Sequence, residues 1–229
     1  MAEQLPLDLP SRAALGRDAF FVSPSNAIAI ATLDNHANWP SGKLALVGPE
    51  SAGKTHLAHV WAAECDAVIL PVRDLAGADI PAVAAKRYVC VEDADTLARA
   101  PNAAALEEAF FHLHNLTLAE AGRLLVTATT PPRDWNLRLP DLASRMEGTA
   151  VVRIAPPDDQ LLAALLVKLF DDRQIAAPET LIPYLVKRIE RSARAAQEIV
   201  ENLDRAALAC GKPVSRALAA KLLDGDSET

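Results

Sequence analysis

The feature that most constrains this chain is the octapeptide at positions 48–55, Gly-Pro-Glu-Ser-Ala-Gly-Lys-Thr. It fits G-x-x-x-x-G-K-[ST], the phosphate-binding P-loop. Residues 43–47 before it are typical of a short buried strand, and residues 55–64 after it have the apolar spacing of a helix. A strand, a glycine loop and a helix in this order allow backbone N–H groups to surround phosphate oxygens. We therefore predict that the chain binds a nucleotide here.

The P-loop pattern also assigns roles to single residues. Lys54 is expected to reach the β- and γ-phosphates, and the Thr55 hydroxyl to bind Mg²⁺. The alternative is a chance match in an ordinary turn, which is rare in a chain with only 9 Gly in 229 residues. The residues of this segment that we predict to contact the nucleotide are Gly48, Pro49, Glu50, Ser51, Ala52, Gly53, Lys54, Thr55 and His56.

A second apolar run, residues 88–91, ends abruptly in Glu92 and Asp93. A buried strand that delivers carboxylates beside a P-loop is how P-loop ATPases handle Mg²⁺ and the attacking water. The alternative is a strand end followed by a solvated acidic turn. With the P-loop upstream, we predict that Glu92 binds the metal and that Glu92 and Asp93 belong to the catalytic group.

The order of apolar segments predicts an α/β fold. Further short strands are expected at residues 66–70, 123–128 and 150–154, with helices between them. Five such strands favour a doubly wound, mainly parallel sheet between helices. We assign residues 15–155 to this nucleotide-binding domain. The helices expected around it cover residues 25–37, 79–85, 102–120 and 138–146.

Beyond Pro156-Pro157 the pattern becomes wholly helical, and residues 156–224 are predicted to form a small all-helical domain. Pro178 is expected at the first position of one helix. Ser192 is expected to cap another, which ends at Gly211. Residues 225–229 form a polar tail.

The first 14 residues stand apart from the rest of the chain. Residues 4–9, Gln-Leu-Pro-Leu-Asp-Leu, are too rich in proline to continue a helix. Their leucines alternate, so an extended segment projects all three to one side. The segment is either a tail or strand that belongs to its own domain, or a peptide that places its leucines in a groove on another protein.

Composition excludes several classes of function. The net charge of −7 argues against a basic duplex-DNA surface, and the 4% of aromatic residues argues against base stacking. No apolar run reaches the ~18 residues of a membrane span, and the N-terminus lacks a secretory signal. Three scattered cysteines favour reduced thiols in a cytoplasm. His112 and His114, two residues apart on a predicted helix, do not share a face for a metal.

Other segments resemble AAA+ proteins, and in detail the DnaA branch. Residues 21–26, Phe-Val-Ser-Pro-Ser-Asn, are similar to the segment that lines the adenine pocket of DnaA-like proteins, which implicates Phe21, Val22 and Asn26. Residues 137–145 resemble the segment that ends in the arginine finger, which implies that role for Arg145. Residues 189–194 are similar to the sensor 2 region, with Arg194 as its arginine, and residues 125–128 occupy the sensor 1 strand.

The chain is most similar to the Hda family, the short DnaA-like AAA+ proteins of regulatory inactivation of DnaA. The family begins with a Gln-Leu-x-Leu-x-Leu peptide that binds the sliding clamp, the β subunit of DNA polymerase III. Gln4, Leu5, Leu7 and Leu9 fit this peptide within residues 1–14. DnaA itself also carries a helix-turn-helix domain for its origin boxes, which this sequence lacks, so no direct sequence-specific DNA binding is expected.

The resemblance implies a cytoplasmic, replisome- and nucleoid-associated regulator with no membrane partner and with a possible homo-oligomeric state. It binds ADP or ATP with Mg²⁺, and it stimulates hydrolysis of DnaA-bound ATP through Arg145 in trans, which prevents over-initiation. Two departures from the family argue for weak hydrolysis by the chain itself: Glu92-Asp93 replaces Asp-Asp, and Thr129-Thr130 replaces Asp-Arg. The alternatives are a DnaC-like helicase loader, a non-hydrolysing adaptor and an autonomous ATPase.

Overall fold

The structure is a computed structural model that describes residues 21–225. The predicted clamp peptide, with Gln4, Leu5, Leu7 and Leu9, lies outside the described residues. Within them, five strands form one sheet in the order β2-β3-β4-β1-β5, and every neighbouring pair is parallel. This confirms the predicted α/β class. The strands are β1 (Lys43–Val47), β2 (Val68–Pro71), β3 (Tyr88–Glu92), β4 (Arg123–Ala128) and β5 (Ala150–Arg153).

Strand β1 is central, and all five of its residues are buried. It pairs with β4 on one side and β5 on the other, so Leu44 lies opposite Leu125 and Ala150. A parallel strand covered on both faces reads as a continuous apolar run, as the sequence of β1 does. The P-loop follows directly at its carboxyl end.

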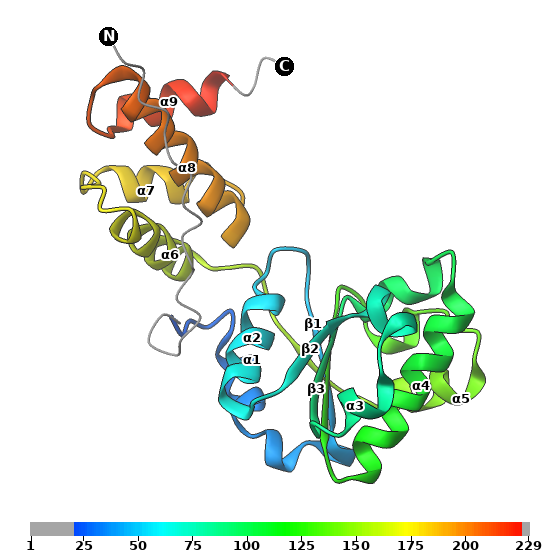
Figure 1. Ribbon diagram of the computed structural model, residues 1–229. Helices are drawn as coiled ribbons and strands as arrows, with labels where there is room; N and C mark the ends of the chain where they lie inside the picture. The colour runs from blue at the N-terminus through cyan, green and yellow to red at the C-terminus, as the bar shows by residue number, and fades with distance from the viewer. Residues whose placement is uncertain (1–20, 226–229) are drawn as a thin grey trace.

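Helices cover both faces of the sheet (Figure 1). Leu44 and Leu46 pack in the cluster formed with α1 (Ala27–Asp34) and α2 (Lys54–Cys65). Ala45 and Val47 point the other way and join a second cluster. The alternation follows from the two-residue period of a strand. Helices α3 (Ile80–Ala84), α4 (Ala103–Ala119) and α5 (Pro140–Glu147) cover that second face.

The helices that follow the sheet have a hydrophobic core of their own, centred on Leu162, Leu166, Leu185 and Leu203. They are α6 (Asp159–Asp172), α7 (Leu181–Val186), α8 (Ala193–Cys210) and α9 (Arg216–Gly225), and Figure 1 shows them as a separate layer to one side of the sheet. The domain boundaries set at 155 and 224 stay a prediction.

The signals that begin and end α8 act as predicted. The Ser192 side chain accepts a hydrogen bond from the Ala195 backbone N–H, and the helix ends at Gly211 with a φ of 60°. The prediction for Pro178 was wrong. Helix α7 begins at Leu181, and Pro178 belongs to the preceding turn, where its carbonyl accepts from the Leu181 N–H.

Two other boundaries differ from the expectation. The helix expected at residues 25–37 is α1, which ends at Asp34, followed by a 3-10 turn at His36–Asn38. Strand β2 begins at Val68, because Asp66 adopts a left-handed conformation (φ 54°) that ends α2. It includes Pro71, which is tolerated because β2 lies at the edge of the sheet. Further 3-10 turns are Pro40–Gly42, Val72–Gly77, Ala94–Arg99 and Pro132–Asp134.

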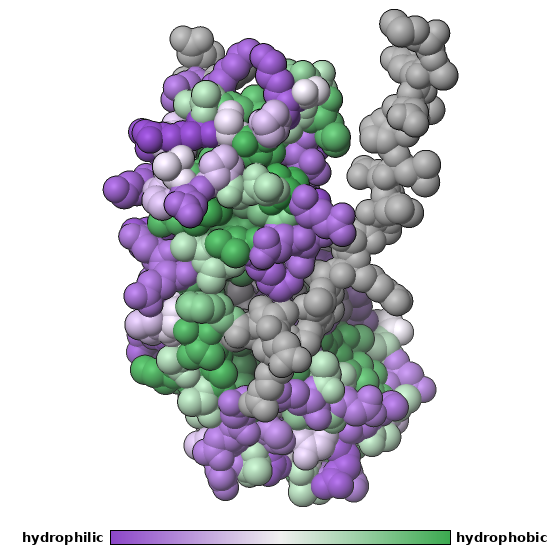
Figure 2. Space-filling view, turned by 90° about the vertical axis from the view of Figure 1, so that its left-hand side faces the viewer, coloured by the Kyte–Doolittle hydropathy of each residue, from purple (hydrophilic) through white to green (hydrophobic). Residues whose placement is uncertain are grey.

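Figure 2 shows the face that lies on the left of Figure 1. Hydrophobic residues gather around the middle of this face, and the lower end is mainly hydrophilic. Among residues 21–225, no helix combines the length and the apolar character needed to cross a bilayer.

Candidate nucleotide-binding site

The P-loop adopts a backbone that its glycines make possible. A Cβ at Gly48 would lie 2.5 Å from both the carbonyl oxygen and the Cγ2 of Ile154, so a side chain there collides with the residue after β5. Gly53 has a φ of 101°, which L-residues rarely adopt. Ser51 is also left-handed, with a φ of 58°. The loop therefore follows the close turn that the motif requires before α2.

The side chain of Lys54 is buried within this loop. Its Nζ donates to the carbonyl oxygens of Gly48 and Pro49, each at 2.8 Å. Burial lowers the pKa of Lys54, while the carboxylates of Asp93, Asp95 and Glu50 act in the opposite direction. The ammonium thus lies at the centre of the loop, where an anionic ligand offers it a stronger partner than two carbonyls do.

The carboxylate of Glu92 at the end of β3 fits a cation. Its Oε1 is buried and has no hydrogen-bond partner among residues 21–225. Burying an unpaired carboxylate oxygen is costly, whereas a hard cation such as Mg²⁺ binds oxygen ligands and would satisfy it. Thr55, at the start of α2, is exposed and offers a second oxygen. The donor set therefore suits the predicted metal residues, Thr55 and Glu92.

Asp93 occupies a constrained position next to Glu92. It has a φ of 55°, and its backbone N–H donates to Thr127 Oγ1 at 3.1 Å. Thr127 lies in β4, the predicted sensor 1 strand, and its side chain is fully buried. The hydrogen bond joins the ends of β3 and β4, so the acidic strand end and the sensor 1 strand form one unit.

Asp95 also links the ends of β3 and β4, a role that the sequence around it does not predict. Its Oδ2 accepts from the backbone N–H groups of Thr129 and Thr130, at 3.0 and 3.3 Å, and from both threonine hydroxyls. The pair that departs from the DnaA pattern is therefore anchored to the turn after β3. The sequence carries no signal for this contact, because Asp95 and Thr129 are 34 residues apart.

The segment expected to line the adenine pocket is held together by Asn26. Its Oδ1 accepts from the Ser23 backbone N–H at 2.8 Å, and its Nδ2 donates to the Phe21 carbonyl at 3.0 Å. Asn26 is buried, while Phe21 and Val22 are exposed. We conclude that Asn26 shapes the segment and that Phe21 and Val22 are the side chains available to a ligand.

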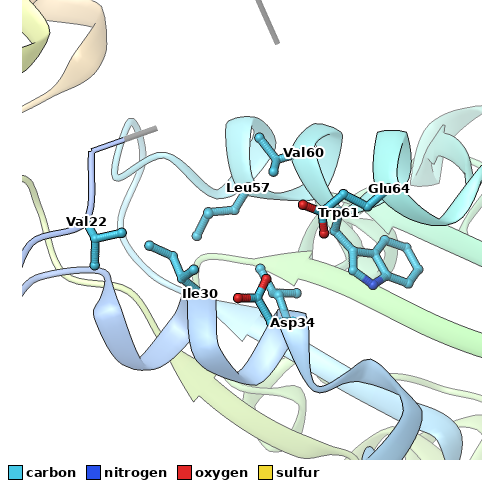
Figure 3. A pocket seen from close by; sticks show the side chains of 8 residues that line it. Val22, Ile30, Asp34, Leu57, Val60, Trp61 and Glu64 are labelled. Carbon is cyan, nitrogen blue, oxygen red and sulfur yellow. The ribbon is translucent and has the colours of Figure 1, made fainter. Parts of the chain in front are cut away.

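Val22 also lies at one end of a pocket of about 170 Å³ between α1 and α2 (Figure 3). Apolar side chains from the two helices face one another across it. The carboxylates of Asp34 and Glu64 lie toward the end away from Val22. A second hollow, of about 490 Å³, lies at the carboxyl ends of β1, β4 and β5. It is lined by Gly48 and Pro49 of the P-loop, and by Ile28, Thr129 and Arg153.

The helical part approaches the P-loop at the start of α8. The Ala193 N–H donates to the Ser51 carbonyl at 3.5 Å. Arg194 follows directly, but its Nε donates to Glu198 Oε1 at 2.7 Å in an exposed ion pair. His56 faces the same junction, and its pKa is lowered by burial, by His59 and by Lys168 of α6. Arg194 is thus near the loop along the chain, with its side chain engaged by Glu198.

Arg145 is exposed in the last turn of α5, and its guanidinium lies over the Phe111 ring at 5.4 Å from the centroid. Its carbonyl accepts from Lys43 Nζ. Lys43 is the first residue of β1, whereas the P-loop follows the last one, so the strand of about 15 Å separates the two ends. Arg145 therefore lies near the amino-terminal end of β1, whereas its own P-loop follows the carboxyl-terminal end.

No His/Cys/Asp/Glu cluster suited to a metal ion occurs among residues 21–225. His114 is buried against the second face of the sheet, and His112 is exposed. The two side chains thus lie on different faces of α4, as their spacing predicts.

Proteins with a similar architecture are found among replication and recombination factors. Domain III of the replication initiation protein DnaA from Thermotoga maritima superposes with a TM-score of 0.73 and 19% identity, over 93% of this chain and 96% of that domain. AMPPCP-bound DnaA from Aquifex aeolicus gives 0.66 and 15% over 81% of this chain, which spans 63% of that protein. The RuvB Holliday junction branch migration motor of Thermotoga maritima gives 0.65 and 17%, covering 86% of this chain and 68% of the motor.

This is the AAA+ fold. The strand order β2-β3-β4-β1-β5, the P-loop after β1 and the helical part after β5 all belong to it. No protein-family model matches the sequence. At identities of 15–19%, the likeness establishes the architecture alone.

Proposed function

We propose that this AAA+ protein is a nucleotide-dependent regulator of replication initiation of the Hda type, which stimulates hydrolysis of DnaA-bound ATP. The observation that carries the proposal is the position of Arg145. It is exposed and lies at the amino-terminal end of β1, the end opposite its own P-loop. An arginine placed there cannot serve its own phosphate site, and it suits contact with a nucleotide bound by a neighbouring subunit.

The nucleotide of this chain is ADP or ATP. Lys54 would leave the carbonyls of Gly48 and Pro49 for the phosphates, and Phe21 and Val22 would contact the base. Thr55 and Glu92 would hold Mg²⁺, which neutralises phosphate charge. Support comes from the backbone of the P-loop, from the orphaned Glu92 oxygen and from the AMPPCP-bound DnaA that shares the fold. Asp93, beside Glu92, would orient water if this chain hydrolyses ATP itself.

Arg145 acts on the nucleotide of DnaA. A guanidinium brought to the γ-phosphate from a neighbouring subunit stabilises the charge that develops in the transition state, as arginine fingers do in GTPases. The stacking of Arg145 on Phe111 limits its rotamers without burying its charge. Arg194 serves the chain's own nucleotide from the helical part, once its ion pair with Glu198 opens.

The clamp peptide, Gln4, Leu5, Leu7 and Leu9, restricts this activity to active replication. An extended peptide with alternating leucines can place these side chains in a groove on another protein. Bound to the sliding clamp on DNA, it would bring Arg145 to DnaA only after replication has begun. The protein acts in the cytoplasm at the replisome, with the sliding clamp and DnaA as partners.

Phosphate release from DnaA preloaded with ATP tests the proposal. The purified chain is added with sliding clamp loaded on DNA, with free clamp, or with no clamp. Release that accelerates only with the loaded clamp is the expected result. Equal rates in all three arms contradict the proposal, and capture of a replicative helicase in place of clamp and DnaA would favour the loader alternative.

A further inference from the structure

The helix that carries Arg145 is held at both ends by buried charged side chains from other elements. Helix α5 has only eight residues, too few to be stable alone. Its ends must therefore be fixed by tertiary contacts, and the two contacts involve Glu107 of α4 and Lys43 of β1. Figure 1 shows α5 beside α4, on the far side of the sheet from α6 to α9.

Glu107 holds the amino-terminal end. Its Oε2 accepts from the backbone N–H groups of Leu139 and Arg138, at 2.6 and 2.9 Å, and its Oε1 accepts from Arg138 at 3.2 Å. Leu139 is the N-cap residue and offers no side-chain oxygen. The carboxylate of Glu107, only 1% exposed, instead fixes the backbone of the two residues that lead into α5.

Lys43 holds the carboxyl-terminal end. Its Nζ donates to the Arg145 carbonyl, which also accepts from Thr149 Oγ1 at 3.1 Å. A second neighbour of the ammonium is His114 Nε2, at 3.5 Å. Lys43 is 7% exposed, and its pKa is lowered by burial and by the charge of Arg145. The ammonium thus contacts the carbonyl of Arg145 itself, the residue proposed to act on the partner's nucleotide.

The signs of the two charges match the helix dipole. A carboxylate stabilises the positive amino-terminal end and a cation the negative carboxyl-terminal end. Each charge alone would be costly to bury, and main-chain hydrogen bonds to a helix end offset that cost. The hydrophobic cluster that covers this face of the sheet includes Leu106 and Leu113 of the same helix as Glu107, so the buried carboxylate lies beside apolar packing.

We propose that Glu107 and Lys43 are positioning residues that hold α5 at both ends and so fix the direction in which Arg145 projects. The proposal rests on the function proposed above for Arg145, but the charged pair itself concerns only this chain. Its loss should release the helix locally and leave the P-loop, at the other end of β1, unaffected.

Hydrogen exchange measures the effect of the charged pair without any partner protein. The variants are Glu107→Gln and Lys43→Met, which keep side-chain size and remove the charge. The matched controls are Glu108→Gln and Lys86→Met, two exposed neighbours on α4 and before β3. We expect the amides of residues 141–147 to exchange about 10-fold faster or more in the two variants, at unchanged nucleotide affinity. Unchanged exchange in α5 overturns the proposal.

Stimulation of DnaA-bound ATP hydrolysis supplies the second measurement. Misplacement of a catalytic group by about 1 Å can cost ~10²-fold in rate, so the maximal stimulated rate should fall by that order. The concentration of this chain that gives half-maximal stimulation should stay the same, because the binding surface is intact. A fall in apparent affinity with an unchanged maximal rate contradicts a positioning role.

The two proposals can fail separately. If the wild type does not stimulate DnaA, the proposed function fails, and exchange in α5 still decides on the role of the charged pair. If Lys43→Met does not fold, Glu107→Gln, which preserves volume, carries the test. Failure of both variants to fold would overturn the proposal, because the two residues would then support the whole domain.

Discussion

At the scale of single residues, the buried ammonium of Lys54 can exchange one set of partners for another. Two carbonyls of its own loop hold it at 2.8 Å, and carboxylates nearby counteract the effect of burial on its pKa. Phosphate oxygens provide charge-assisted hydrogen bonds, which are roughly twice as strong as neutral ones. Under the proposed function, the side chain therefore lies in place for the phosphates before the nucleotide binds.

Replacing Lys54 with alanine should remove the response to nucleotide. At ligand concentrations of ~100 Kd, binding stabilises a protein by about 2.7 kcal/mol, which raises Tm by roughly 5–10 °C for this size. We expect that rise for the wild type and for the exposed control Lys212→Ala, and none for Lys54→Ala. A thermal-shift titration with ATP or ADP and Mg²⁺ is the measurement, and an equal rise in Lys54→Ala would refute the assigned role.

His114 should make stability fall in acid. Burial and the charges of Lys43 and Arg145 lower its pKa from 6.5 to about 4, against the opposing hydrogen bond to Asn115. The folded state therefore keeps His114 neutral, while the unfolded chain takes up a proton below pH 6.5. The free energy of unfolding should lose about 1–2 kcal/mol between pH 6.5 and 5 from this residue.

Urea unfolding of the wild type and of His114→Gln across this pH range isolates that contribution. Carboxylates titrate alike in both proteins, so the difference between the two pH profiles belongs to His114. Parallel profiles would show that the folded state does not keep the histidine neutral.

At the scale of elements, the sequence predicts what local chemistry determines. The apolar run of β1, the P-loop glycines, Ser192 and Gly211 act within a few residues of themselves, and their roles follow from the sequence. The prediction that Pro178 begins a helix was wrong because proline suits a turn before a helix as well as the first helical position. The end of α1 at Asp34 likewise carries no strong stop signal.

Contacts between distant elements could not be predicted. The binding of Asp95 to Thr129 and Thr130, and of Glu107 and Lys43 to the ends of α5, join residues 31 or more positions apart. Their partners are mainly backbone groups, which carry no sequence signature. The position of Arg145 relative to β1 belongs to the same class, because it follows from the order of the strands.

The amino-terminal peptide should behave as a detachable element. Replacing Gln4, Leu5 and Leu7 together with alanine should abolish binding to the sliding clamp, because an extended ligand depends on its few anchor side chains. Tm and nucleotide affinity should not change. Clamp pull-down and thermal shift are measured side by side, and loss of nucleotide binding in the triple variant would show that the segment belongs to the fold.

At the scale of the whole molecule, the P-loop and Arg145 lie at opposite ends of the central strand β1. The P-loop follows β1, and Arg145 contacts the residue at which β1 begins. Such an arrangement suits subunits that stack with the arginine of one facing the P-loop of the next. Under the proposed function, that next subunit is DnaA.

The most direct test of the proposed function is phosphate release from DnaA-bound ATP, with loaded clamp and the variant Arg145→Ala. Loss of an arginine finger in trans typically costs ~10³-fold or more, so stimulation should vanish while the variant's own nucleotide affinity stays unchanged. Arg133→Ala, which removes another exposed arginine between β4 and α5, should stimulate like the wild type. Full stimulation by Arg145→Ala would contradict the role proposed for this arginine.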